Sequence, residues 1–97
     1  MKNLLISSGV RLKLLEKHVG ITQEDIEECF ANLQGRFLYD NREQHKSNPQ
    51  TLWFIAENNK GRLIKVVFIP LPNGQLRIRT AFDPNADEIR IYQKLAL

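Results

Sequence analysis

The stretch TLWFIAENNKGRLIKVVFIPLPNGQLRIRTAF, residues 51–82, decides the fold. It is rich in the β-branched and aromatic residues that favour strands, and two turn signals divide it. The first is Asn58-Asn59-Lys60-Gly61, and the second, at 72–74, contains an Asn-Gly pair that accepts positive φ angles. We therefore predict three consecutive antiparallel strands, over 51–57, 62–69 and 75–82.

The third of these strands shows the regular alternation of a strand with two different faces. On one face we expect Leu76, Ile78, Thr80 and Phe82, and on the other Arg77, Arg79 and Ala81. Residues 36–39 predict a short fourth strand, and 40–49 are polar and typical of a loop.

A helix is predicted before the strands, over 22–33. Thr22 is a candidate N-cap, and Asp25 three residues later fits a capping box. Apolar residues then follow at helical spacing: Ile26, Cys29, Phe30 and Leu33. Gly35 is placed to end this helix.

Two more helices are predicted, one near each end of the chain. The first runs from Ser8 to about His18, with Leu12 and Leu15 among its inward-facing residues. The last helix opens after Asp83-Pro84, where a helix start tolerates proline. Its inner stripe is Ile89, Tyr92, Leu95 and Ala96.

The order of these elements is helix, helix, three to four antiparallel strands, helix. This order predicts an α+β fold in a single domain over residues 1–97, a common size for one domain.

Net charge, cysteine content and the length of apolar runs limit the partners and cofactors that we expect. Fourteen Lys and Arg face eleven Asp and Glu, so the net charge of +3 favours a nucleic-acid partner only slightly. Cys29 is the only cysteine, and no Cys/His spacing typical of zinc occurs, so we expect neither a disulfide nor a metal or other cofactor. The sequence lacks both a membrane-length apolar run and a signal peptide, so we expect a cytoplasmic protein without a membrane partner.

Basic side chains recur on the predicted strands. Arg77 and Arg79 share one face of a strand, and Arg62 and Lys65 lie in the neighbouring strand. Guanidinium groups can hold an RNA phosphate and stabilise the negative charge that develops on phosphorus during cleavage. The alternative is that these residues form the solvent-exposed face of an antiparallel sheet.

Five other residues are candidates for chemistry or for RNA contact. His45 can transfer protons, and Lys46 beside it can bind RNA, although both fit an ordinary polar loop. His18 is a second histidine, at a position that also suits a helix cap. Tyr92 is a possible proton donor or a core residue, and Glu57 a possible general base or an exposed strand end.

Parts of the chain resemble the BrnT-type toxins of the RelE-like superfamily. Residues 17–26, KHVGITQEDI, resemble the family's KHG-(V/I)-S/T-x-E-E stretch, with Val19 inserted. Residues 61–68, GRLIKVVF, and 76–81, LRIRTA, are similar to its C-terminal strands, and the helix through Tyr92 follows in the same order.

The resemblance implies a RelE-like fold and a toxin of a type II toxin–antitoxin pair that cleaves RNA without a metal. The 2′-hydroxyl of RNA would attack the adjacent phosphorus, and a nearby gene would encode the antitoxin. The matching polar residues are His18, Arg62, Arg79 and Tyr92, with Lys65 a weaker addition.

In that mechanism Arg62 and Arg79 hold the phosphate, and Glu57 or a histidine accepts the proton. Tyr92 or His45 then donates a proton to the leaving oxygen. The alternative hypothesis is a non-catalytic module that binds nucleic acid or a protein through the same basic strand face.

Overall fold

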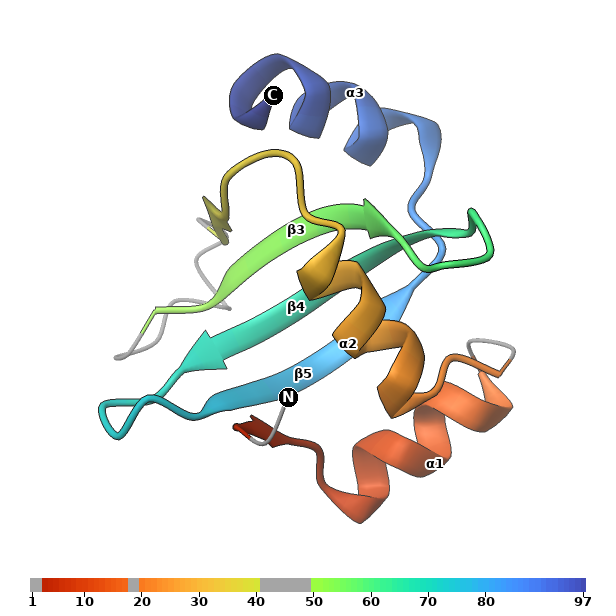
Figure 1. Ribbon diagram of the computed structural model, residues 1–97, viewed down its shortest axis with the longest axis vertical. Coiled ribbons are helices and arrows are strands. Elements are labelled where there is room, and N and C mark those ends of the chain that lie inside the picture. The colour runs from red at the N-terminus through yellow and green to blue at the C-terminus, as the bar shows by residue number, and fades with distance from the viewer. Residues whose placement is uncertain (1–2, 18–19, 41–49) are drawn as a thin grey trace.

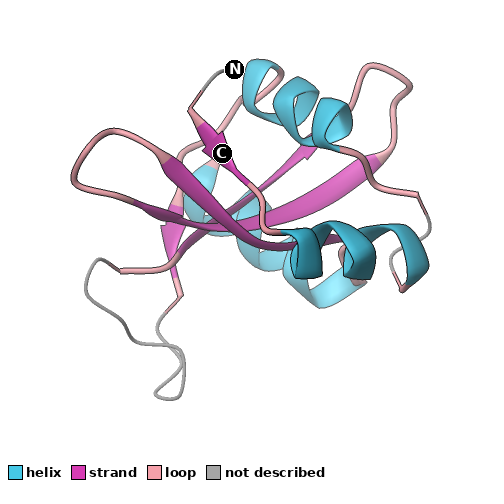
Figure 2. Cartoon of the chain, turned by 90° about the horizontal axis from the view of Figure 1, so that it is seen from below, coloured by secondary structure: helices cyan, strands magenta, loops and turns pink. Residues whose placement is uncertain are grey.

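The computed structural model describes residues 3–17, 20–40 and 50–97. Within them lie three helices and a sheet of five strands in the order β1-β5-β4-β3-β2 (Figure 1). The elements are β1 (Leu4–Leu5), α1 (Ser8–Glu16), α2 (Gln23–Ala31), β2 (Leu38–Tyr39), β3 (Leu52–Glu57), β4 (Leu63–Pro70), β5 (Leu76–Phe82) and α3 (Ala86–Ala96). Helices lie on both sides of the sheet (Figure 2), which confirms the predicted α+β class.

The sheet is mixed, so the prediction of a purely antiparallel sheet of three to four strands was wrong. β2 to β5 are antiparallel, but β1 pairs in parallel with β5, with Leu4 opposite Leu76. β1 was missed because a two-residue strand has no periodicity of its own, and its partner lies about seventy residues away. The two predicted hairpin turns are confirmed, with Gly61 and Gly74 at φ angles of 84° and 88°.

α2 packs against β3 and β4 and forms the main core with them. Its predicted capping box is confirmed, since the Asp25 N–H donates to Thr22 Oγ1 and the Thr22 N–H donates to Asp25 Oδ2, at 3.1 and 3.0 Å. The buried residues that meet there include Ile26, Cys29, Phe54, Val66, Phe68 and Ile78.

The region that follows α2 differs from the prediction. The helix ends at Ala31, with Asn32 as its cap, so Gly35 does not end it. Gly35 instead lies against α3, because a Cβ atom at this position would be 2.7 Å from the carbonyl oxygen of Ala96. The glycine is therefore needed for close contact between two backbones.

α1 lies beside β5 and is less amphipathic than expected. Leu14 is buried and Val10 packs against the core, but the side chains of Leu12 and Leu15 are 56% and 57% exposed. Their predicted inward orientation was wrong. Val10 and Leu14, four residues apart on one face, are enough to pack this short helix against the core.

β5 contains an irregularity that changes the predicted alternation. Val67 pairs with Thr80 and the next residue, Phe68, pairs with Ile78, so Arg79 is an extra residue in β5. Such a bulge shifts the facing of the residues beyond it. Ala81 is therefore buried on the side of Ile78, and the expected stripe through Thr80 and Phe82 was wrong.

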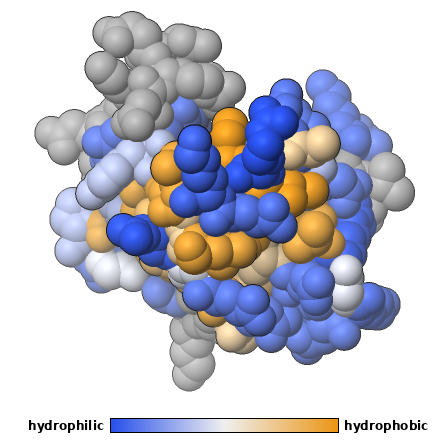
Figure 3. Space-filling view, turned by 90° about the horizontal axis from the view of Figure 1, so that it is seen from above, coloured by the Kyte–Doolittle hydropathy of each residue, from blue (hydrophilic) through white to orange (hydrophobic). Residues whose placement is uncertain are grey.

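α3 leaves part of its surface apolar. Tyr92 and Ala96 are buried as predicted, whereas Leu95 is exposed, together with Ile91 and Leu97. The view from the α3 side shows apolar surface surrounded by polar side chains (Figure 3). No helix in the described parts of the chain is long and apolar enough to cross a membrane.

Candidate functional site

Arg62 is already engaged with a carboxylate. Its Nε and Nη2 atoms donate to Asp83 Oδ1 and Oδ2 at 2.8 and 3.0 Å, a two-point ion pair between the β3–β4 hairpin and the end of β5. The hydrogen bonds to Asp83 raise the pKa of Arg62, and the charge of Asp25 on α2 adds to the effect. This arginine joins elements of the fold and is not free to hold a phosphate.

Lys65 is likewise part of the packing between the sheet and α3. Its Nζ atom donates to Glu88 Oε2 at 2.6 Å and lies 4.4 Å from the centre of a Trp53 ring. The lysine side chain is only 12% exposed. Lys65, a predicted RNA contact, thus holds the first turn of α3 against the sheet.

Arg77 and Arg79 are both exposed and line one surface hollow of about 450 Å³ between β5, β1 and the start of α1. We call it the β5 hollow; its lining residues are Leu5, Ile6, Ser7, Val10, Ile69, Arg77, Ile78 and Arg79. None of these carries a carboxylate, and the first turn of α1 has no acidic residue. Within the described parts of the chain, no ion pair neutralises either arginine.

The structure does not bring Arg62 and Arg79 together. Lys65 is opposite Phe82, and because the strands are antiparallel, Arg62 and Arg79 lie in opposite directions from this pair. At about 3.3 Å per residue, the two arginines are about 15–20 Å apart along the strands. A phosphate clamp made by this pair is not formed, and Arg77 is the arginine that accompanies Arg79.

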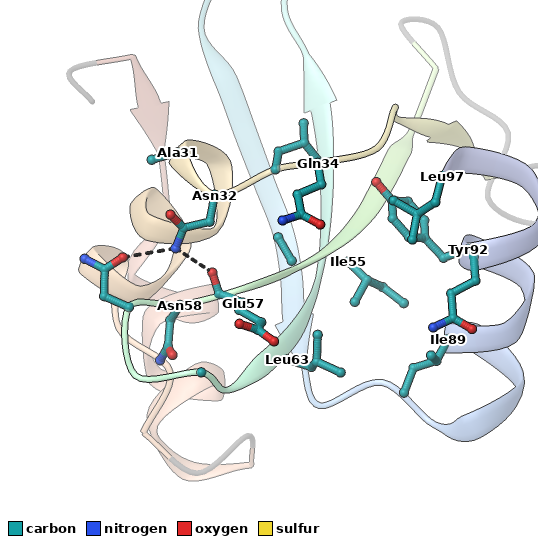
Figure 4. A pocket seen from close by; sticks show the side chains of 15 residues that line it. Ala31, Asn32, Gln34, Ile55, Glu57, Asn58, Leu63, Ile89, Tyr92 and Leu97 are labelled. Atoms are coloured by element: carbon teal, nitrogen blue, oxygen red, sulfur yellow. Dashed lines mark hydrogen bonds between the residues drawn. The ribbon is translucent and has the colours of Figure 1, made fainter.

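Glu57 and Tyr92 line a second, larger cavity of about 750 Å³ (Figure 4). We call it the hairpin pocket, and it lies between the end of α2, the β3–β4 hairpin and α3. It is lined by Ala31, Asn32, Leu33, Gln34, Ile55, Ala56, Glu57, Asn58, Asn59, Gly61, Leu63, Ile89, Tyr92, Gln93 and Leu97.

The two candidates differ in their freedom to react. The Tyr92 hydroxyl donates to the carbonyl oxygen of Arg36 at 2.7 Å, and burial raises its pKa. It therefore has a structural partner and is a poor proton donor. Glu57 is exposed at the end of β3, and its carboxylate has no hydrogen bond or ion pair within the described residues.

The remaining candidates, His18, His45 and Lys46, lie outside the described residues. Within those that are described, no group of three or more His, Cys, Asp or Glu side chains is arranged to hold a metal ion.

Sequence reasoning missed the polar framework of the hairpin pocket. Asn58 is buried, and its Oδ1 accepts hydrogen bonds from the N–H groups of Lys60 and Arg62, while its Nδ2 donates to Asp25. The turn signal at Asn58 indicated a hairpin but not this network. Gln34 and Gln93 come from separate elements, so no local pattern joins them.

Comparison with protein-family models, with curated proteins and with solved structures finds no match to this chain.

Proposed function

We propose that this protein binds RNA and that the β5 hollow holds the sugar-phosphate backbone. One observation carries the proposal: Arg77 and Arg79 are exposed in one hollow whose described lining residues include no acid, whereas Arg62 and Lys65 are paired. Guanidinium groups suit phosphate oxygens because they present a planar set of donors. The hollow is thus the least neutralised cationic site among the described strand residues.

The helix beside the hollow carries exposed lysines toward its C-terminal end. α1 packs beside β5, and Lys13 in its last turn and Lys17 at its C-cap are exposed. Additional cations near a phosphate site strengthen binding of a polyanion and make it sensitive to salt. A flexible single strand can bring its phosphates to separate cationic side chains more easily than a stiff duplex.

The test is titration of a fluorescently labelled, single-stranded oligouridylate, followed by anisotropy over a series of salt concentrations. Arg77→Ala and Arg79→Ala should each weaken binding and reduce the slope of log K against log salt by about one. The matched control is Arg90→Ala, which removes an exposed arginine of α3 that pairs with Asp87. Equal losses in all three variants would contradict a specific role for the hollow.

As a second function, we propose the metal-independent endoribonuclease toxin of a type II toxin–antitoxin pair. Its support is the order of elements, since two helices, the strands containing 61–68 and 76–81, and a final helix through Tyr92 follow the BrnT-like pattern. It ranks second because the residues that line the β5 hollow offer no histidine, tyrosine or carboxylate to transfer a proton.

A cleavage assay separates the two functions. Purified protein is incubated with total RNA beside Arg62→Ala and Arg79→Ala variants, and the new ends are tested for the cyclic phosphate that 2′-hydroxyl attack leaves. The toxin proposal expects cleavage by the parent chain and its loss in Arg79→Ala. It also expects growth arrest on expression, relieved by the product of a neighbouring antitoxin gene. If the protein binds the oligouridylate but leaves total RNA intact, the toxin proposal is contradicted and only the binding function remains.

A further inference from the structure

The outer edge of β3 is open beside the hairpin pocket. β2 pairs with β3 at Leu38–Trp53 and Tyr39–Leu52, and the same register, continued, would place Arg36 opposite Ile55. Arg36 does not pair there. Its N–H donates to the carbonyl oxygen of Ala96, and its carbonyl accepts from the Tyr92 hydroxyl.

Ile55 is left with polar backbone groups that face the pocket. The backbone N–H of Asn58 donates to the carbonyl oxygen of Arg62, so Asn58 belongs to a hydrogen-bonded pair with β4. Hydrogen-bonded pairs alternate along an antiparallel ladder, so the backbone groups of Ile55 and Glu57 point away from β4, toward the outer edge of β3. The Glu57 carbonyl accepts from Asn32 Nδ2 at 2.9 Å. The outward N–H and C=O of Ile55 have no partner in the described residues, although Ile55 is only 8% exposed. Buried backbone groups are nearly always paired with protein or water, so a ligand that reaches this edge finds a donor and an acceptor without a protein partner.

The rest of the lining combines polar groups with apolar side chains. Glu57 carries the only charged side chain among the lining residues, and Gln34 and Gln93 have carboxamides without a partner within the described residues. Gln34 reaches the pocket from the segment after α2, and Glu57 from the end of β3 (Figure 4). The apolar walls are Leu33, Leu63, Ile89 and Leu97.

We propose that the hairpin pocket binds a guanine base. Guanine presents a ring N–H beside an exocyclic amine, and a carboxylate such as Glu57 can accept from both at once. Its O6 atom needs a donor, which the Ile55 N–H or a carboxamide supplies. Adenine and cytosine each offer one amine on this edge and uracil only a ring N–H, so each makes fewer bonds to a carboxylate.

Two other occupants fit the pocket less well. A phosphate is disfavoured because the one charged lining side chain, Glu57, is negative. An added peptide strand needs several consecutive open positions. Among the described residues, only Ile55 and the Glu57 N–H are open beyond the Trp53–Leu38 pair, because Asn32 occupies the Glu57 carbonyl. A single planar base needs only one or two open backbone groups.

The hairpin pocket shares no lining residue with the β5 hollow, so this inference goes beyond the proposed RNA binding and does not depend on it. The experiment uses guanosine, which has no phosphate, against adenosine, cytidine and uridine. Binding is followed by amide chemical shifts in ¹⁵N-labelled protein. We expect guanosine to bind most tightly and to move the amide signals of Ile55 and Glu57.

The deciding variant is Glu57→Gln, which keeps the shape of the side chain and replaces one carboxylate oxygen by a donor. We expect it to raise the Kd for guanosine about ten-fold or more. Glu24→Gln makes the same change at an exposed residue of α2 and should have no effect. Because Glu57 is exposed, its replacement should not unfold the protein, which the spectrum of the variant checks directly.

A second pair of ligands, the pentanucleotides UUGUU and UUAUU, identifies the source of the base. Preference for guanosine indicates a nucleoside site, and a preference seen only for UUGUU, and lost in Glu57→Gln, indicates a base presented by RNA. Equal affinity for all four nucleosides and both pentanucleotides would overturn the proposal, as would guanosine binding unchanged in Glu57→Gln. Loss of oligouridylate binding in the arginine variants would bear on the β5 hollow only.

Discussion

The phenolic oxygen of Tyr92 lies 2.7 Å from the carbonyl oxygen of Arg36, to which it donates a hydrogen bond. The Arg36 N–H donates in turn to the carbonyl oxygen of Ala96, so both backbone groups of one residue are bound to α3. These contacts draw the chain away from β3 after α2. The hairpin pocket exists because Arg36 bonds to α3 and does not continue the pairing of β2 with β3.

Removal of the Tyr92 hydroxyl should therefore cost stability. Tyr92→Phe keeps the ring packing against Trp53, at 5.7 Å between centroids, but leaves the Arg36 carbonyl without its donor. We expect a loss of about 1 kcal/mol in the free energy of unfolding, measured by urea denaturation. Tyr39→Phe is the matched control, since Tyr39 is largely exposed. An equal effect of both variants would contradict the structural role of the Tyr92 hydroxyl.

Gly35 should be the least replaceable glycine with an ordinary φ angle. In Gly35→Ala the new Cβ would lie 2.7 Å from the backbone oxygen of Ala96, so the segment or α3 has to move. We expect a loss of about 1–3 kcal/mol in thermal or urea unfolding. Gly9→Ala, inside α1 with no atom within 4 Å of the added Cβ, should instead stabilise by about 0.5–1 kcal/mol. Comparable changes for both would indicate that Gly35 does not contact α3.

The sequence predicted the features that neighbouring residues determine. The capping box of Thr22 and Asp25 and the two glycine turns are local, because each is formed by groups within a few residues of one another. By contrast, the parallel pairing of β1 and the extra residue at Arg79 depend on distant partners. The pairing of Arg62 with Asp83 likewise joins two elements, so no spacing could have shown that this arginine is occupied.

In the candidate site, too, the sequence predicted local features but not contacts between distant residues. A basic pattern on β5 was visible in the sequence, and Arg77 and Arg79 do share a hollow. The sequence placed Arg62 with them because it lies in the neighbouring strand, but register puts it at the far end. In the sequence Glu57 is an isolated acid, whereas its neighbours in the hairpin pocket come from three separate elements.

Asp25 should make stability depend on acid pH. Burial alone would raise its pKa, but hydrogen bonds from Thr22 and Asn58 and the charge of Arg62 outweigh this and lower the pKa below 3.8. A carboxylate with a depressed pKa contributes stability above its unfolded pKa, and the contribution is lost as the pH falls through the folded pKa. Asp25→Asn should thus be less stable than the parent near pH 6, with a smaller decline toward pH 2. Parallel stability curves from urea denaturation across that range would contradict this role.

Cys29 should be inert toward thiol reagents while the protein is folded. Burial raises its pKa to about 12, with the negative charges of Asp25 and Glu28 adding to the effect, and its Sγ lies 3.6 Å from the carbonyl oxygen of Ala56. The thiolate is the reactive form, and at about pH 8 it is scarcely populated in the folded state. We expect a disulfide reagent to label the native protein only at the rate of opening and to label it fully in denaturing urea. Gly35→Ala should speed native labelling if opening is global, because that variant is less stable. Rapid labelling of the native parent chain would show that α2 does not cover Cys29 as the structure has it.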